Sequence, residues 1–384
     1  MNYFLTEEQE MIQELAARVA DEKMAPLAIE YDELGKFPTD IVKILADSDL
    51  CGVYIEEEYG GLGGGIFEMA LVVEQLSRAC GGMSLAFAGT GLGTYPIILF
   101  GSDDQKKKYL PDIASGKKLA AFGLTEANAG SDAAGIQTTA VLDGDEYILN
   151  GTKQWITNGG QADVYTVIAC TNRDKGARGF SAFIVEKDTP GFSIGKKEDK
   201  MGIRASATTE LVFQDCRIPK ENLLAKEGFG FIVAMKTLDR TRPGVAAQAL
   251  GIAQGAYDEA LKYSKERVQF GRPISDNQAI QHMLADMAIQ IEATRAVVYQ
   301  TCRTIDSGEK DISRDSAISK VMASDTAMKV TTDAVQVMGG YGYMKEYPLE
   351  KRMRDAKITQ IYEGTNQIQR NIIALEELKS LAKK

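Results

Sequence analysis

The sequence predicts an α+β fold with a helical N-terminal domain, a central antiparallel β-domain and a C-terminal four-helix bundle. Apolar residues recur at helical spacing over the first 118 residues, short β-rich runs with turn signals fill residues 119–226, and long helical patterns return over 227–384. We take these three ranges as the expected domains. A chain of 384 residues with 44% hydrophobic content is long enough for two or three such domains.

Three helices are expected in residues 1–118. The first lies in FLTEEQEMIQELAARVADEKMAP, where Thr6 is a candidate N-cap and Pro26 a stop. The others lie in PTDIVKILADSDLCG and IFEMALVVEQLSRACGG, and each closes at glycine. The intervening YGGLGGG is either a plain loop or a phosphate cradle. We favour the loop, because no G-x-G-x-x-G frame fits and no strand leads into it.

The central and C-terminal regions each carry a local signal. In AVLDGDEYIL, Asp143 and Gly144 indicate the turn of a β-hairpin in a mostly antiparallel domain. After Gly228 a long helical pattern follows, and Pro243 is expected to interrupt or kink it. Three more helices are expected over residues 276–307, 313–338 and from Gly364 to the end.

Composition excludes several classes of function. The formal charge of −10 argues against nucleic acid as the main partner, because phosphate binding needs a basic surface. The five cysteines lack C-x-x-C spacing, which favours reduced structural thiols over disulfides or zinc. The acidic start has no apolar signal region, and no apolar run approaches the ~18 residues of a membrane span. We therefore expect a cytoplasmic protein without a membrane partner.

The single histidine restricts the chemistry. His282 lies in a helical pattern and is expected on a helix face, so metal sites and triads based on histidine are disfavoured. A carboxylate must then carry any proton transfer. The candidate is Glu363 in TQIYEGTNQIQR, where Tyr362 would exclude water on one side and Gly364 would let a ligand approach closely. We expect Glu363 to be a general base and expect no metal.

Five motifs in order, AFGLTEANAGSD, WITNGG, KERVQFGRPI, QVMGGYGY and RDAKITQIYEGTNQIQR, resemble the acyl-CoA dehydrogenase family over nearly the whole chain. The likeness is to its short- and medium-chain branches, including bacterial butyryl-CoA dehydrogenases. It implies the family fold and an FAD cofactor bound without a Rossmann domain, which explains the missing glycine fingerprint.

The resemblance also implies where the flavin ring lies. In the first motif a strand and turn would line it, with backbone groups and Thr125 bonding its polar edge, and Ser131 would contact the CoA ligand. In the second, Trp155 would lie beside the ring and Thr157 near its reactive nitrogen. The implied contacts in this part are Phe122, Leu124, Thr125, Ser131, Trp155, Ile156 and Thr157.

The rest of FAD would be bound by residues that the family supplies from a neighbouring subunit, so the resemblance implies an oligomer, expected to be a homotetramer. Arg267 is the matching cation for the anionic part. The implied contacts are Arg267, Gln269, Phe270, Gln278, Gln336, Val337, Gly339 and Gly340, followed by Thr365, Asn366 and Gln367 after the base. Asp239 and Arg242 match substrate contacts, together with Ser131, Tyr362 and Gly364.

The implied activity is α,β-dehydrogenation of a short- to medium-chain acyl-CoA thioester to the trans-2-enoyl-CoA, with electrons passed to electron-transfer flavoprotein. Thr241, where some relatives place their base, cannot serve as one. Phe87 and Tyr95 either point into the acyl pocket and shorten it or pack against the helical bundle. Weighing bulky residues and short-chain motifs together, we expect a preference for C4 to C6 chains.

Two alternatives stay open at the level of sequence. The same site could run in reverse, as an enoyl-CoA reductase. From a different class, the chain could be a catalytically silent binding or scaffold subunit, although the joint presence of Glu363, Arg267 and Trp155 argues against that reading.

Overall fold

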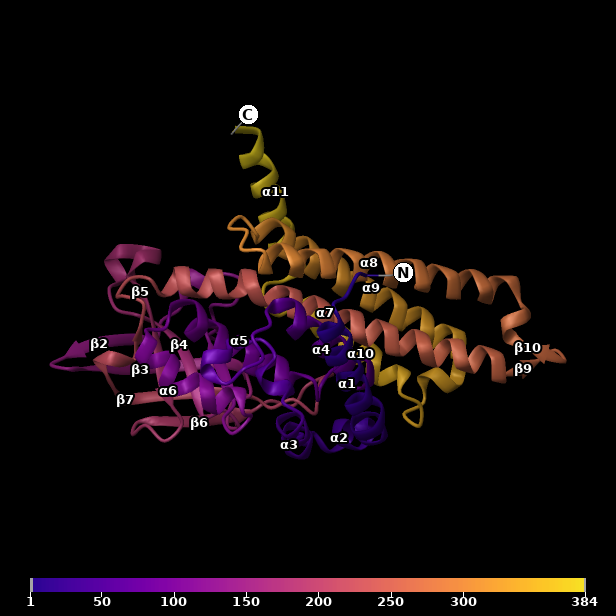
Figure 1. The fold of residues 1–384 in the computed structure, drawn as a ribbon, viewed down its shortest axis with the longest axis horizontal. Helices are drawn as coiled ribbons and strands as arrows, with labels where there is room; N and C mark the ends of the chain where they lie inside the picture. Colours follow the sequence, from indigo (N-terminus) through magenta and orange to yellow (C-terminus); the bar gives the residue numbers. More distant parts are fainter. Residues whose placement is uncertain (1–2, 383–384) are drawn as a thin grey trace.

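The computed structural model describes residues 3–382 and places helices at both ends of the sequence around a central sheet (Figure 1). This arrangement confirms the predicted fold class. The N-terminal helices are α1 (Glu7–Val19), α2 (Ala28–Leu34), α3 (Thr39–Asp47), α4 (Ile66–Ala79), α5 (Leu85–Phe100) and α6 (Asp103–Ala114). Thr6 caps α1 as expected, since its side chain accepts a hydrogen bond from the Gln9 backbone N–H.

The central sheet consists of β1 (Ala120–Gly123), β2 (Thr139–Asp143), β3 (Glu146–Thr157), β4 (Val164–Cys170), β5 (Phe180–Glu186), β6 (Phe192–Lys197), β7 (Thr208–Pro219) and β8 (Leu223–Leu224). Strands β2 and β3 form the predicted hairpin, in which Asp143 pairs with Glu146. The sheet is mostly antiparallel, but β4 pairs in parallel with β1 and, at one position, with β2. Helix α5 packs against β1 and β4.

The C-terminal region consists of α7 (Gly230–Glu266), the short strands β9 (Val268–Gln269) and β10 (Arg272–Pro273), and helices α8 (Gln278–Asp306), α9 (Ser313–Met338), α10 (Leu349–Thr359) and α11 (Asn366–Ala382). Helices α7, α8 and α9 pack side by side, and α10 packs on α7 and α9. His282 lies exposed on α8, as expected.

Pro243, which was expected to interrupt or kink the long helix, does not interrupt it, because α7 runs through the proline as one helix. Proline removes the N–H that would bond the carbonyl four residues earlier, which is that of Asp239. In the structure the Asp239 carbonyl instead accepts a hydrogen bond from the Ser316 hydroxyl of α9 at 2.5 Å. A neighbouring helix therefore satisfies the group that the proline leaves free.

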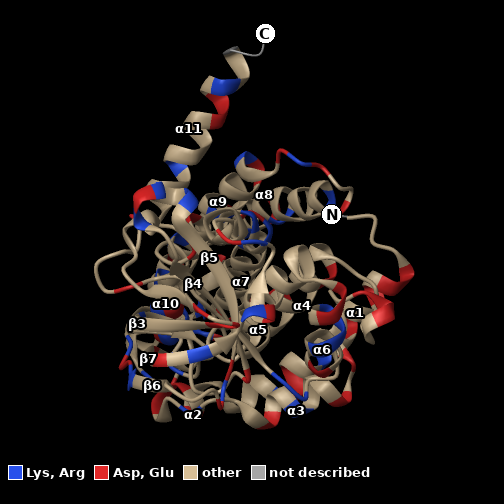
Figure 2. Cartoon of the chain, turned by 90° about the vertical axis from the view of Figure 1, so that its left-hand side faces the viewer, with Lys and Arg blue, Asp and Glu red and all other residues tan. Residues whose placement is uncertain are grey.

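One continuous hydrophobic core joins the helices of both ends and reaches the sheet, and a second core lies on the other side of the sheet. All five cysteines are buried and free. Figure 2 shows acidic and basic residues interspersed over the surface elements, with α11 projecting from the body. Between residues 3 and 382, no helix has the length and apolar content that crossing a membrane requires.

Candidate active site

Glu363 lies in residues 360–365, here called the base loop, which joins α10 to α11. Glu363 has φ +51° and Gly364 has φ +91°. The left-handed region costs a residue with a side chain roughly 1–2 kcal/mol, and such strain persists only where the surroundings enforce it. Two consecutive left-handed residues turn the chain sharply and present the Glu363 side chain to α7.

Polar side chains from three helices hold the carbonyl groups of this turn. The Glu363 carbonyl accepts hydrogen bonds from Arg242 Nε at 3.3 Å and Gln369 Nε2 at 3.0 Å. The Gly364 carbonyl accepts from Gln369 Nε2 at 3.1 Å and from Lys320 Nζ at 2.9 Å. The strained turn is therefore fixed by α7, α9 and α11 together.

Among the described residues, one side chain bonds the carboxylate of Glu363 directly. Thr241 donates its hydroxyl to Glu363 Oε2 at 2.8 Å. Burial raises the pKa of Glu363 above its ordinary value, while the Thr241 hydrogen bond and the charges of Arg242 and Lys320 oppose that rise. A carboxylate with a raised pKa is a stronger base than one in water, which suits the removal of a weakly acidic proton.

Tyr362 is oriented by a chain of hydrogen bonds that reaches the N-terminal helices. Its hydroxyl donates to Gln248 Oε1 on α7, and Gln248 Nε2 donates to the Gly81 carbonyl at 2.9 Å in the break between α4 and α5. The predicted water-excluding ring is thus tied in place beside the base.

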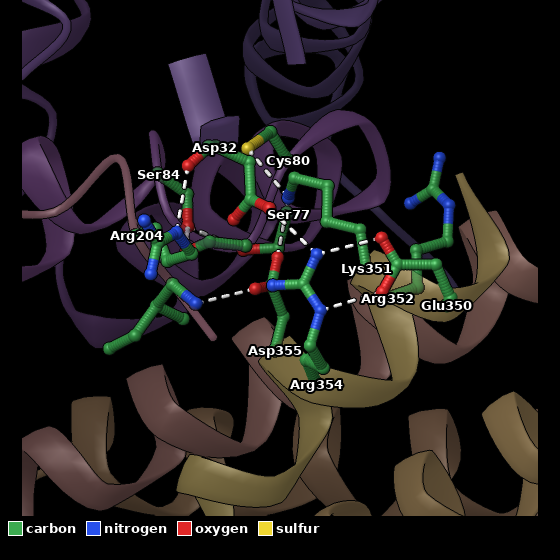
Figure 3. Close-up of polar contacts among 12 residues, drawn as sticks. Asp32, Ser77, Cys80, Ser84, Arg204, Glu350, Lys351, Arg352, Arg354 and Asp355 are labelled. Carbon is green, nitrogen blue, oxygen red and sulfur yellow. Dashed lines mark hydrogen bonds and ion pairs between the residues drawn. The ribbon is translucent and has the colours of Figure 1, made fainter. Parts of the chain in front are cut away.

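Helix α10, which leads into the base loop, is anchored by a buried polar network (Figure 3). Lys351 Nζ donates to Asp355 Oδ2 at 2.5 Å and to Cys80 Sγ at 3.1 Å. Asp355 Oδ1 accepts the backbone N–H of Ile203 at 2.5 Å. Arg354 pairs with Asp32 of α2 at 2.7 Å. The network therefore connects α10 to the N-terminal helices and to the loop between β6 and β7.

The residues predicted beside a flavin ring lie together at one end of the sheet. The backbone N–H of Gln154 donates to the Thr125 carbonyl at 2.8 Å, which joins β3 to the turn after β1. Next to Gln154, Trp155 has φ +59° and its side chain is 54% exposed. The strained backbone at this position presents the one indole of the chain to solvent, where it could pack against the flat, partly apolar ring of a flavin. Phe122, Leu124 and Ile156 are buried, Thr125 and Thr157 are half-buried, and Ser131 is exposed.

The residues predicted for the rest of FAD lie around β9, β10 and the end of α9, at the end of the long axis away from the sheet (Figure 1). Arg267 ends α7, with its guanidinium 5.2 Å from the centre of the Tyr341 ring. Phe270 is fully exposed at the β9–β10 turn, and Gly339 and Gly340 have open space where a side chain would be. Gln269, Gln278 and Gln336 are exposed as well, and Val337 is buried. One chain therefore does not bring the two groups together.

The three residues predicted to contact FAD after the base differ in burial. Asn366 is buried at the start of α11, Gln367 is exposed and Thr365 is half-buried. Asp239 and Arg242 are both buried and form an ion pair at 2.9 Å beneath the base loop. Their role as CoA contacts stays a prediction.

Phe87 and Tyr95 pack against the helical body. The Tyr54 ring stacks on Tyr95 at 5.8 Å between centroids and meets Phe87 edge-on at 5.8 Å. The half-buried positions of α5 are instead held by smaller residues such as Ala88 and Leu92. The aromatic pair therefore takes the second of the two placements considered from the sequence.

Sequence reasoning considered Thr241 only as a base and dismissed it, and it did not single out Gln248 or Lys320, although all three contact the base loop. Thr241 and Gln248 are seven residues apart on α7, so they share one helix face. That spacing was a usable signal, but no local pattern marks Lys320, whose contact with the base loop spans 44 residues.

Sequence models of three domains match the chain. They are described as Acyl-CoA dehydrogenase, N-terminal domain over residues 6–117, middle domain over 121–216 and C-terminal domain over 228–378. Among curated proteins, acryloyl-CoA reductase (NADH) of Anaerotignum propionicum is 48% identical over 381 residues, which is 99% of this chain and 96% of the relative.

Two solved structures are similar over nearly the whole chain. Butyryl-CoA dehydrogenase from Megasphaera elsdenii has a TM-score of 0.96 and 49% identity, covering 98% of this chain and 100% of that one. A chain in the structure of the electron transferring flavoprotein of Acidaminococcus fermentans, studied for flavin-based electron bifurcation, has a TM-score of 0.96 and 52% identity with the same coverage.

Proposed function

The chain belongs to the acyl-CoA dehydrogenase family, and on this premise we propose that it oxidises a short-chain acyl-CoA thioester to the trans-2-enoyl-CoA, using FAD and passing electrons to electron-transfer flavoprotein. The observation that carries the proposal is the carboxylate of Glu363, partly buried, bonded to Thr241 and held in a strained turn by three helices. The likeness to butyryl-CoA dehydrogenase supports the substrate class.

In this reaction Glu363 removes the proton from the α-carbon of the thioester. Bound FAD supplies the acceptor for the hydride that leaves the β-carbon, so that a carbon–carbon double bond remains. Thr241 holds Oε2 of the base, and its hydrogen bond favours the carboxylate form that accepts the proton. Tyr362 keeps water from one side of the base. Gly364 adopts the left-handed backbone of the turn, and the Gln369 side chain occupies the position that a side chain at 364 would take.

We propose that two subunits of a homotetramer together form each FAD-binding site. The ring-binding group around Trp155 lies on the sheet, whereas the group around Arg267 lies at the end of the long axis away from the sheet, so a neighbouring copy would bring one to the other. Helix α11 projects from the body with Leu375, Leu378 and Leu381 exposed on it, and these residues supply an apolar surface for assembly.

Replacing Arg267 with alanine is expected to weaken retention of FAD, because a cation that would face the anionic part of the cofactor is lost. Assembly should weaken as well, since a ligand bound only by the assembled form stabilises it by mass action. Thermal melts with and without added FAD measure both effects. Lys265→Ala, on the exposed last turn of α7, is the control. An unchanged melt with full flavin occupancy would contradict the assignment of Arg267.

The enzyme is expected to prefer saturated acyl-CoA thioesters of four to six carbons. Since Phe87 and Tyr95 pack against the helical body, this expectation now depends on the short-chain motifs and the likeness to butyryl-CoA dehydrogenase. Each methylene beyond the space available should be disfavoured by roughly 1–3 kcal/mol. The test is a series of straight-chain acyl-CoAs assayed for kcat/KM with an artificial electron acceptor. A maximum at eight carbons or longer would refute the length preference, and no turnover with any chain would refute the dehydrogenase itself.

Reduction of an enoyl-CoA at the same site is a second candidate, favoured by the 48% identity to an acryloyl-CoA reductase. Protonated Glu363 would then return its proton to the α-carbon. The test compares two rates: reduction of a short enoyl-CoA with reduced electron-transfer flavoprotein, and oxidation of the matching saturated acyl-CoA with oxidised electron-transfer flavoprotein. The faster rate shows which direction the protein partner drives.

A further inference from the structure

Lys320 is an unusual buried cation. Three lysines are buried within residues 3–382, namely Lys153, Lys320 and Lys351. Lys153 pairs with Glu126 at 2.7 Å and Lys351 with Asp355 at 2.5 Å. Lys320 is fully buried and, within the described part of the chain, has no carboxylate at ion-pair distance. Burying an ammonium group without such a partner costs several kcal/mol, so its presence calls for a physical reason.

The contacts of Lys320 supply that reason. Its Nζ donates to the Gly364 carbonyl at 2.9 Å and to Asn366 Oδ1 at 2.9 Å. It therefore bridges the last part of the base loop and the first residue of α11. Asn366 is held in turn by Ser324 and Asp325 of α9, each accepting from its Nδ2 at 2.8 Å. The lysine thus fixes the turn after Glu363 to a rigid helix.

The charges around Glu363 come from two helices and its own loop. Helix α7 contributes Arg242 with its partner Asp239, α9 contributes Lys320 and Asp325, and Tyr362 precedes the base. Arg242 is neutralised in part by the buried carboxylate of Asp239 at 2.9 Å. Lys320 has no such direct counter-ion, so its field acts on Glu363 with less compensation.

We propose that Lys320 is a positioning residue for the reaction, which holds the strained turn carrying Glu363 and supplies positive charge beneath its carboxylate. This inference rests on the proposed role of Glu363 as the base. Burial lowers the pKa of Lys320 to about 7, and the charge of Glu363 opposes that fall. Below that pH the lysine therefore carries its charge, and this charge favours the carboxylate form of Glu363.

Lys320→Met tests the proposal, because it keeps most of the volume and removes both the hydrogen bonds and the charge. In the FAD-loaded enzyme, we expect the single-turnover rate of flavin bleaching by butyryl-CoA to fall at least about tenfold, the scale of a displaced catalytic group. KM should change little. The pH midpoint of the bleaching rate should move to higher pH, because a charge that favours the carboxylate form of Glu363 is gone.

Two further variants separate the contributions. Lys329→Met removes an exposed lysine of the same helix, which pairs with Asp333, and should leave both the rate and the pH midpoint unchanged. Lys320→Gln keeps a hydrogen-bond donor but no charge. It should recover part of the rate while its pH midpoint stays displaced, and it replaces the methionine variant if that variant does not retain FAD.

The inference is overturned if both Lys320 variants bleach at the normal rate with a normal pH midpoint, or if the rate falls with the midpoint unmoved. Failure of both to retain FAD would make Lys320 a folding residue and would overturn it too. Failure of the proposed function is a separate result, since Glu363→Gln would then keep its turnover whatever the Lys320 variants do.

Discussion

Replacing Glu363 with glutamine is expected to remove nearly all turnover while bound FAD is retained. An amide is close in shape to a carboxylate and can accept the Thr241 hydrogen bond through its oxygen, but it cannot take up the α-proton of the thioester. The rate should fall at least ~10²-fold, the usual contribution of a positioned general base. Steady-state turnover, flavin absorbance and single-turnover bleaching with butyryl-CoA measure the two properties separately.

Glu346→Gln is a matched control, because Glu346 is an exposed acid in the segment that precedes α10. The wild-type bleaching rate should rise with pH through a midpoint above the ~4.3 of an ordinary glutamate, since burial raises the pKa of Glu363 and only the carboxylate accepts a proton. The glutamine variant should show no such rise. Near-normal turnover in that variant would remove Glu363 from the mechanism.

The fold class followed from the sequence because its signals are local. Helical spacing, the Thr6 cap and the Asp143–Gly144 turn each depend on residues that are close along the chain. The interruption considered at Pro243 is absent, and the hydroxyl that bonds the carbonyl left free by the proline, that of Ser316, lies on another helix. A long-range hydrogen bond of this kind leaves no mark in the pattern around the proline.

In the candidate site too, residues with local sequence signals could be predicted, whereas residues placed by long-range contacts could not. Glu363 and Trp155 could be singled out because their immediate neighbours are informative, and the structure places both in strained backbone at exposed or half-buried positions. Thr241 and Lys320 meet the base only through folding, at separations of 122 residues for the hydrogen bond to Thr241 and 44 for the bond from Lys320 to the next carbonyl. Contacts between residues so far apart in the sequence can be identified only from the three-dimensional structure.

The anchoring of α10 also depends on contacts far apart in sequence, and it leads to a prediction about stability. Lys351 and Asp355 form an i,i+4 pair whose side chains are 5% and 1% exposed. Burial disfavours the charge on Lys351, but the field of Asp355 outweighs it, so the pKa of Lys351 lies above its usual value. The stabilisation that comes with a raised lysine pKa is fully present below the unfolded pKa of about 10.4. It is lost only as the pH rises through the pKa of the folded state.

Asp355→Ala is therefore expected to lower the free energy of unfolding by about 3–5 kcal/mol at neutral pH, because it leaves a buried ammonium group without its partner and frees the Ile203 N–H. The same substitution in an i,i+4 pair at the surface, Asp333→Ala beside the exposed Lys329, should cost no more than about 0.5 kcal/mol. Urea unfolding of the FAD-loaded proteins at pH 7 compares the two. Equal midpoints for the two variants would show that the network around α10 does not stabilise the fold, and that the base loop is held by its contacts with α7, α9 and α11 alone.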